Sequence, residues 1–376
     1  MRRRKSPHFP TLLRFSVDFP RFLLYNKAKN IHKSHAWGGR APPAIPPPES
    51  EVLFMPAKKQ RVLVISSANI DFVQRMRRVP YSGETVVEND LGYSYVPGGK
   101  GANSAISFAR FGADTVFACK LGQDANARRL VSLYQREGID TRYILEDPDA
   151  PTGLASILVE DNGKNRIIVY PGANMTLSAD DIENAFTCYP DALYMQLEIP
   201  DEAVIEASRR ANDEGVPVFI DAGPARLDFP LERLGRLEIF SPNENETRIF
   251  TGISPTSEES CLRAAIKLST LVDAKYIVLK LGDRGAFIYD GREYFTVPAE
   301  PVEAVDTTAA GDVFTAVMTY VYLQNGNILS AVKYATCAAA ISVTRAGAST
   351  SIPTLEEVVA YAKEKVAREN GEEESE

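Results

Sequence analysis

From Arg61 onward the chain alternates between short apolar runs and longer segments whose apolar residues recur at helical spacing. The first run, residues 61–66, reads Arg-Val-Leu-Val-Ile-Ser, which is typical of a strand buried on both faces. Such alternation predicts βαβ units and a mostly parallel sheet with helices on both faces. We therefore predict a three-layer α/β/α core. The expected strands are residues 61–66, 115–120, 192–196, 218–221, 239–241 and 276–281. The expected helices are residues 104–110, 126–137, 180–186, 201–214, 258–271, 312–323, 328–344 and 355–368.

Two segments break this alternation. Residues 85–96 alternate polar and apolar side chains, and residues 153–170 read as a hairpin with Asn162-Gly163 at its turn. Neither is followed by a helix that could return it to the main sheet. We therefore expect a small separate β-sheet, formed by segments of about 72–97 and 151–171, that acts as a lid over one edge of the core.

The two ends differ from the body, which we place at residues 57–370. Residues 1–56 are basic, with ten Lys and Arg against three Asp and Glu up to Leu53, and include a Pro-rich run at 41–48. Three interpretations of this leader stay open: a mis-assigned start with Met55 as the true initiator, an organelle targeting peptide, or a functional arm. The acidic tail, residues 371–376, is expected to be disordered.

Charge and hydropathy exclude several classes of partner. The net charge is −8, and the excess of acidic residues lies in the body, which argues against nucleic acid as a partner. No run approaches the roughly 18 apolar residues of a membrane span. The four cysteines are far apart, without the spacing of a zinc site or a disulfide framework, which fits the cytoplasm.

The histidines exclude several catalytic chemistries. All three, His8, His32 and His35, lie in the leader. Ser-His-Asp and Cys-His catalysis and His-ligated zinc are therefore not expected in the body. A general base there has to be Asp, Glu, Lys, Tyr or Cys.

The strongest motif is the run from Asp306 to Asp312, Asp-Thr-Thr-Ala-Ala-Gly-Asp, which leads into a helix expected to begin near Gly311. Small side chains allow a phosphate to approach the backbone, and N–H groups at a helix N-terminus bind anions. Asp312 would then lie where a substrate hydroxyl meets that phosphate. The alternative is that Asp312 only caps the helix.

A second Gly-rich turn, Pro97-Gly-Gly-Lys-Gly-Ala-Asn103, opens the helix expected at 104–110. It matches neither a P-loop nor a dinucleotide fingerprint. It could be a simple turn, or it could bring the backbone close to a polyhydroxyl ligand, with Lys100 and Asn103 supplying directed bonds.

Polar side chains also follow three expected strands. Asn69 and Asp71 come after the first strand and would point the same way in an extended chain, which suits two neighbouring hydroxyls. Asn243 and Glu246 share one helix face, which suits Mg²⁺ and its waters or a capping box. Residues 280–285, Lys-Leu-Gly-Asp-Arg-Gly, could line a nucleotide site or form an ordinary hairpin connection.

Taken in this order, these segments resemble the ribokinase family of carbohydrate kinases. The resemblance runs from about Arg61 to Arg368. Its most specific part is the pair GGKGAN at 98–103 and DTTAAGD at 306–312. Segments 195–198, 241–246 and 281–285 are similar to family segments in the expected order.

The resemblance implies a role for each matching residue. Asp312 would be the base, and the backbone N–H groups of Ala309, Ala310, Gly311 and Asp312 would hold transition-state charge. The implied sugar contacts are Asn69, Asp71, Gly99, Lys100, Asn103, Glu198 and Asp312. The implied nucleotide contacts are Asn243, Lys280, Gly282, Gly285 and Gly311. Glu246 would lie near Mg²⁺. The implied K⁺ site comprises Asp306, Thr308, Ser342, Gly347 and Ser351.

The implied reaction is ATP-dependent phosphorylation of D-ribose to D-ribose 5-phosphate by a homodimer that pairs through the lid. Other acceptors stay open, namely a nucleoside, fructose or a keto-deoxy sugar acid, as does a sugar- or nucleotide-binding regulator without turnover. Two positions depart from the pattern. Ala309 stands where the wider family often has Gly. An alanine at this position avoids backbone strain only if its φ is negative. Lys280 stands where Thr is frequent, which puts the nucleotide contact in question.

Overall fold

The computed structural model describes residues 59–370, so the predicted leader and acidic tail lie outside the described residues. The main sheet contains nine strands in the order β13-β12-β11-β10-β9-β8-β1-β4-β5. The pairs from β11 through β10, β9, β8, β1 and β4 to β5 are parallel, and β12 and β13 are antiparallel. The strands are β1 (Arg61–Ile65), β4 (Asp114–Gly122), β5 (Ile144–Asp147), β8 (Ala192–Met195), β9 (Val218–Asp221), β10 (Arg236–Ser241), β11 (Asp273–Lys280), β12 (Ala286–Tyr289) and β13 (Tyr294–Val297).

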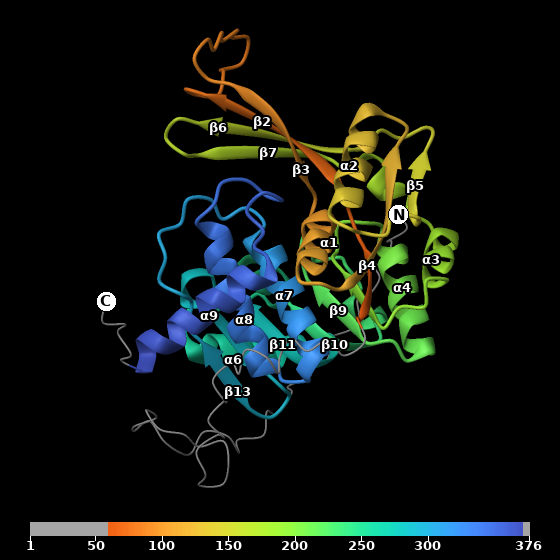
Figure 1. Ribbon diagram of the computed structural model, residues 1–376, viewed down its shortest axis with the longest axis vertical. Coiled ribbons are helices and arrows are strands. Elements are labelled where there is room, and N and C mark those ends of the chain that lie inside the picture. The colour runs from red at the N-terminus through yellow and green to blue at the C-terminus, as the bar shows by residue number, and fades with distance from the viewer. Residues whose placement is uncertain (1–58, 371–376) are drawn as a thin grey trace, which may run out of the picture. The chain divides into compact units, whose positions relative to one another are not determined.

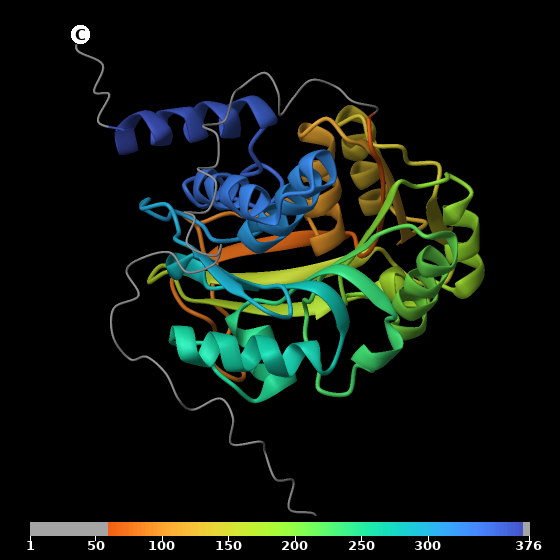
Figure 2. The same ribbon diagram turned by 90° about the horizontal axis from the view of Figure 1, so that it is seen from below.

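Helices cover both faces of this sheet (Figure 2). In β1, Val62 and Val64 pack into one buried cluster with α1, α2, α7, α8 and α9, whereas Leu63 and Ile65 pack into another with α3, α4 and α6. A strand buried on both faces explains the unbroken apolar run in the sequence. The helices are α1 (Lys100–Arg110), α2 (Ala125–Arg136), α3 (Ala179–Phe186), α4 (Asp201–Glu214), α5 (Glu244–Thr251), α6 (Glu258–Ser269), α7 (Ala310–Asn325), α8 (Ile328–Val343) and α9 (Leu355–Asn370). No described helix is long and apolar enough to cross a membrane.

The second sheet has the order β3-β2-β6-β7 and extends away from the main sheet (Figure 1). Its strands are β2 (Asn69–Met76), β3 (Tyr93–Gly98), β6 (Gly153–Glu160) and β7 (Asn165–Tyr170). The hairpin of β6 and β7 turns at Gly163, whose φ of 80° suits glycine. The predicted three-layer core and separate small sheet are therefore confirmed.

Several elements differ from the prediction. The strand expected at 85–96 covers only 93–98, because 85–92 make no ladder pairs. Asn69 and Asp71 lie within the extended strand β2, which meets the condition for the two side chains to point the same way. The four-residue strands β5, β12 and β13 were not predicted, because elements this short carry little periodic signal. Helix α5 was expected only as the face that carries Asn243 and Glu246.

The topology brings the polar segments of the sequence together at one edge of the main sheet. Parallel strands β1, β8, β9, β10 and β11 all end at the same edge, and the polar segments of the sequence follow those ends. Helices α1 and α7 pack against each other, and each begins with a small-residue segment. The functional residues are therefore expected at this edge, beneath the second sheet.

Candidate active site

Asp312 is the third residue of α7 and is 4% exposed. Its Oδ2 accepts a hydrogen bond of 2.9 Å from Asn103 Nδ2, and its Oδ1 lies 3.5 Å from Lys100 Nζ. The residue that caps the helix is Ala309, which has no side-chain acceptor. The capping interpretation of Asp312 is therefore wrong, because its carboxylate points across to α1 instead of to the backbone of its own helix.

The N-terminus of α7 has N–H groups that are free to bind an anion. Ala310 N–H donates to Thr307 O at 3.3 Å, whereas the N–H groups of Gly311 and Asp312 have no acceptor among residues 59–370. Gly311 also presents no side chain in front of them. Free N–H groups at a helix start carry partial positive charge, so this turn can hold a phosphate.

Ala309 has a left-handed backbone, with φ of 63°. The condition for an unstrained alanine at this position, a negative φ, is therefore not met. The sharp entry into α7 requires a left-handed residue before Ala310, and an alanine there costs about 1 kcal/mol more than a glycine.

Burial raises the pKa of the Asp312 carboxyl, and the neighbouring Asp221 raises it further. Lys100, Lys280 and the hydrogen bond from Asn103 oppose this shift without cancelling it. A carboxylate whose pKa is raised toward the working pH accepts a proton more readily. The environment of Asp312 therefore suits a general base.

The residues implied for sugar binding lie around Asp312. Asn69 and Asp71 come from β2, Gly99 and Lys100 from the start of α1, and Glu198 from the turn after β8. Glu198 Oε2 accepts a short hydrogen bond from Ser67 Oγ and a 3.4 Å bond from the Lys100 N–H. The structure thus brings the predicted sugar contacts together around Asp312.

Three buried side chains in this region were not predicted from the sequence. Asn174 donates to Asn69 Oδ1 at 2.7 Å and accepts from the Ala68 N–H at 2.9 Å, so it fixes the Asn69 amide. Ser67 holds Glu198, and Asp221 ends β9 beside Lys280. The available signal for Asn174 was the turn Pro171-Gly-Ala-Asn174 at the end of the hairpin, which is not specific by itself.

The pKa of Asp71 is raised from 3.8 to about 7 by burial and by the carboxylates of Glu198 and Asp312. The folded chain therefore keeps a proton on Asp71 that the unfolded chain has released, and stability falls as pH rises from about 4 to about 7. We expect Asp71→Asn to remove this loss and to be more stable than the natural chain at pH 8 by roughly 1–3 kcal/mol. Unfolding temperatures of both proteins between pH 4 and pH 8 test this, and parallel pH profiles would contradict it.

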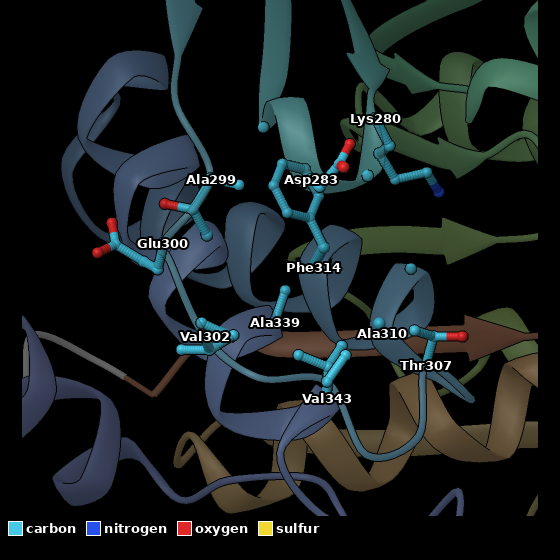
Figure 3. Close-up of a pocket in the computed structure, with 16 residues that line it drawn as sticks. Lys280, Asp283, Ala299, Glu300, Val302, Thr307, Ala310, Phe314, Ala339 and Val343 are labelled. Carbon is cyan, nitrogen blue, oxygen red and sulfur yellow. The ribbon is translucent and has the colours of Figure 1, made fainter.

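A cavity of about 290 Å³ lies on the other side of the α7 N-terminus. Figure 3 shows Val302, Ala339 and Val343 together at one end of it and Lys280 at the other, with the amine turned away from them. A mostly apolar cavity with Lys280 and the start of α7 at one side suits a nucleobase attached to phosphates. The lining residues are Lys280, Gly282, Asp283, Gly285, Ala299, Glu300, Val302, Ala304, Thr307, Ala310, Gly311, Phe314, Thr336, Ala339, Ala340 and Val343.

A second hollow, of about 420 Å³, is lined by Lys280, Gly282 and Gly311 as well, together with Asn243, Glu244 and Asn245. The two hollows therefore meet at the α7 N-terminus. All five residues predicted for the nucleotide line one or both of them. Residues 280–285 also form the connection between β11 and β12, so the hairpin interpretation is confirmed, and a role in nucleotide binding stays a prediction.

Asn243 and Glu246 form the capping box of α5. Asn243 Oδ1 accepts from the Glu246 N–H at 2.9 Å, and Glu246 Oε2 accepts from the Asn243 N–H at 2.7 Å. Burial raises the pKa of Glu246, and the Lys280 charge opposes the rise. Its Oε1 forms no hydrogen bond with the described residues and is available to a ligand. No group of three or more His, Cys, Asp or Glu within residues 59–370 is arranged to hold a metal. The single Glu246 carboxylate suits one ligand of a hydrated Mg²⁺, an ion that usually keeps several of its waters.

The residues implied for K⁺ come from the segment before α7, the end of α8 and the segment that follows α8, and hydrogen bonds of Asp306 join the first segment to the other two. Asp306 Oδ1 accepts from the Thr308 N–H, and Oδ2 accepts from the Gly347 N–H, both at 2.9 Å. These bonds and the Thr308 hydroxyl outweigh burial and lower the pKa of Asp306, which keeps it charged. Ser342 Oγ and Ser351 Oγ are 3.0 Å apart. A carboxylate that stays ionised, with hydroxyl groups and backbone carbonyls nearby, can bind a monovalent cation.

Residues 59–355 match the family model described as pfkB family carbohydrate kinase. The chain belongs to the pfkB family of carbohydrate kinases. The bifunctional ribokinase/ribose-5-phosphate isomerase A of Fructilactobacillus sanfranciscensis is 36% identical over 303 residues, which are 80% of this chain and 56% of that protein. The ribokinase of Staphylococcus aureus is 35% identical over 301 residues, covering 79% of this chain and 98% of the relative.

A solved structure of Arabidopsis thaliana ribokinase, complexed with ribose and ATP, superimposes with a TM-score of 0.74. Its sequence is 31% identical, and the match covers 82% of this chain and 99% of that one. The predicted resemblance is thereby confirmed at the level of the family and the fold. The chain is a pfkB-family sugar kinase. The edge where its parallel strands end carries the polar cluster around Asp312, the free N-terminus of α7 and a mostly apolar cavity.

Proposed function

We propose that this chain transfers the γ-phosphoryl group of ATP to the primary hydroxyl of D-ribose and releases D-ribose 5-phosphate and ADP. The observation that carries the proposal is the place of Asp312. Its carboxylate accepts a hydrogen bond from Asn103, and Asp312 belongs to the first turn of α7, where the N–H groups of Gly311 and Asp312 are free. The ribokinase relatives and the ribose and ATP complex of the Arabidopsis protein support ribose as the acceptor.

In the proposed reaction, Asp312 accepts the proton of the ribose primary hydroxyl as that oxygen attacks the γ-phosphorus. Asn103 and Lys100 hold the Asp312 carboxylate, and the N–H groups of Gly311 and Asp312 bind the oxygens of the transferred group. Catalysis is then mainly positioning and charge stabilisation. Glu246 would hold hydrated Mg²⁺, which neutralises phosphate charge when bound.

The reaction is tested by measuring ADP release from the full chain with Mg·ATP and a panel of acceptors. The panel contains D-ribose, 2-deoxy-D-ribose, fructose, a nucleoside and a keto-deoxy sugar acid. The highest kcat/KM is expected with D-ribose. A preference for another acceptor would leave Asp312 in place but overturn the assignment of Asn69, Asp71 and Asn103 to ribose, and binding without ADP release would favour a regulator.

We expect K⁺ to activate this reaction through the loop of Asp306, Ser342 and Gly347. Replacing K⁺ by Li⁺ at constant ionic strength should lower kcat by roughly tenfold. The reason is that Asp306 lies four residues before α7 and is hydrogen-bonded to Val343 and Gly347, so a cation bound here would help to position the α7 N-terminus. Asp306→Asn should abolish the difference between the two ions, since it removes the permanent charge. Equal rates in both ions for the natural chain would refute the K⁺ site.

We also propose a homodimer formed through the second sheet. Ile167, Ile168, Val169 and Tyr170 of β7 are each 46–55% exposed, which is unusual for four successive large apolar residues. Adjacent residues of a strand point to opposite faces, so the double change Ile167→Lys and Ile168→Lys disrupts either face. Analytical ultracentrifugation should show a dimer for the natural chain and a monomer for this variant, and a monomeric natural chain would overturn the proposal.

A cytoplasmic location of the protein remains a prediction.

A further inference from the structure

Lys280 is the last residue of β11, and its side chain is held in place by two partners. It is 8% exposed. Its Nζ donates to Asp221 Oδ1 at 2.5 Å and to Thr315 Oγ1 at 3.2 Å. Thr315 in turn donates to the Gly311 carbonyl at 3.1 Å, which ties this side chain to the first turn of α7.

The ammonium group lies beside the N–H groups proposed to bind the phosphoryl group. A methyl group placed on Gly311 would lie 3.7 Å from Lys280 Nζ, and Lys280 lines both hollows that meet there. An ammonium has three N–H donors. Two are used by Asp221 and Thr315, and no third acceptor for Nζ occurs among residues 59–370.

Asp221 explains how a lysine can be kept at this depth. It is 1% exposed, and its Oδ2 has no hydrogen-bond partner within the described part of the chain. The carboxylate therefore depends on Lys280 for compensation, and a buried ion pair with one ammonium donor unused is a pre-organised cation. The Lys280 charge also acts on Asp312 and Glu246, so it lies within reach of the base and of the implied magnesium residue.

From this geometry we infer that Lys280 is a further catalytic residue, whose third N–H binds an equatorial oxygen of the γ-phosphoryl group as it is transferred. The inference rests on the proposed function and adds a side-chain cation to the backbone N–H groups of α7. The bond from phosphorus to the ribose oxygen forms while the bond to the β-phosphate oxygen breaks. The proton leaves the ribose hydroxyl for Asp312, and Lys280 keeps its own protons throughout.

The first test compares Lys280→Met, Asp221→Asn and the double variant. Lys280→Met keeps the length of the side chain and should lower kcat by roughly 10²-fold, as loss of one oxyanion donor does, with an unchanged KM for ribose. It also leaves Asp221 unpaired and should lower Tm. The double variant removes both charges, so it should regain Tm but keep the loss in kcat.

Other outcomes would overturn the inference. Recovery of the natural kcat in the double variant would mean that Lys280 only neutralises Asp221. A higher KM for ATP at unchanged kcat would mean that Lys280 binds the ground state alone.

A binding measurement separates this inference from the proposed function. ADP with aluminium fluoride imitates the group in transfer, and the natural chain with ribose should bind it more tightly than ADP. Lys280→Met should lose most of that preference, and an equal preference in both proteins would refute the role of Lys280. Failure of the proposed function would appear differently, as absence of ADP release by the natural chain with every acceptor.

Discussion

Replacing Asp312 with Asn should lower kcat by roughly 10²–10⁴-fold, because the reaction loses the group that accepts the hydroxyl proton. Asn keeps the shape of the side chain and can still accept the hydrogen bond from Asn103 Nδ2. Ribose binding, measured by calorimetry, should therefore change little. The rate of ADP release under saturating ribose and Mg·ATP gives kcat.

Asp273→Asn is the matched control for this substitution. Asp273 is exposed at the start of β11 and lines neither hollow, so its replacement should leave kcat within a few-fold of the natural value. A fall of less than tenfold for Asp312→Asn would mean that another group takes the proton. The pH dependence of kcat gives a second measurement. Activity of the natural chain should be lost at low pH, and the raised pKa of Asp312 should place this loss at a higher pH than for an ordinary Asp.

Gly99→Ala should give the second large effect, on both folding and ribose use. Gly99 has a φ of 92°, and a Cβ there would lie 2.7 Å from Asn69 N and 2.9 Å from Ala68 Cα. The backbone angle alone costs about 1–3 kcal/mol, and relief of the contact has to move Asn69 or the start of α1. A displacement of about 1 Å in a sugar-binding group should lower kcat/KM for ribose by roughly 10²-fold.

Gly138→Ala separates the two causes. Gly138 has a φ of 77° and nothing within 4 Å of the added methyl group. This control should show the cost of the backbone angle as a lower free energy of unfolding, with normal kcat/KM. Equal losses of unfolding free energy and of kcat/KM in Gly99→Ala and Gly138→Ala would contradict the claim that the close approach of the backbones at Gly99 matters for folding and ribose use.

The parts of the fold that could be predicted from the sequence are those whose burial follows a period. The run Val62–Ile65 is apolar because both faces of β1 are covered, and α4 shows one apolar face along its length. Residues 85–92 alternate in polarity, and this pattern predicted a strand. The segment forms no strand in the structure, because no neighbouring strand pairs with it. Short strands at or next to the sheet edge, such as β13 and β12, depend on their neighbours and carry no comparable signal.

The candidate site shows the same division. Asp312, Asn103 and the small residues between Thr308 and Asp312 are visible in the sequence because each motif is contiguous. The pairing of Lys280 with Asp221 joins residues 59 positions apart, and the support of Asn69 by Asn174 joins residues 105 positions apart. No local pattern reports such contacts. The backbone of Ala309 could not be predicted either, because a left-handed alanine is an exception that the surrounding turn imposes.

The most direct test is to follow a mixture of D-ribose, Mg·ATP and the full chain by phosphorus NMR. Transfer to the primary hydroxyl predicts that the γ-phosphate signal is lost as an equal phosphomonoester signal grows, split into a triplet by the two protons of the ribose methylene group. A doublet would place the phosphate on a secondary or anomeric hydroxyl. Growth of inorganic phosphate alone, or unchanged ATP, would contradict ribose phosphorylation by this chain.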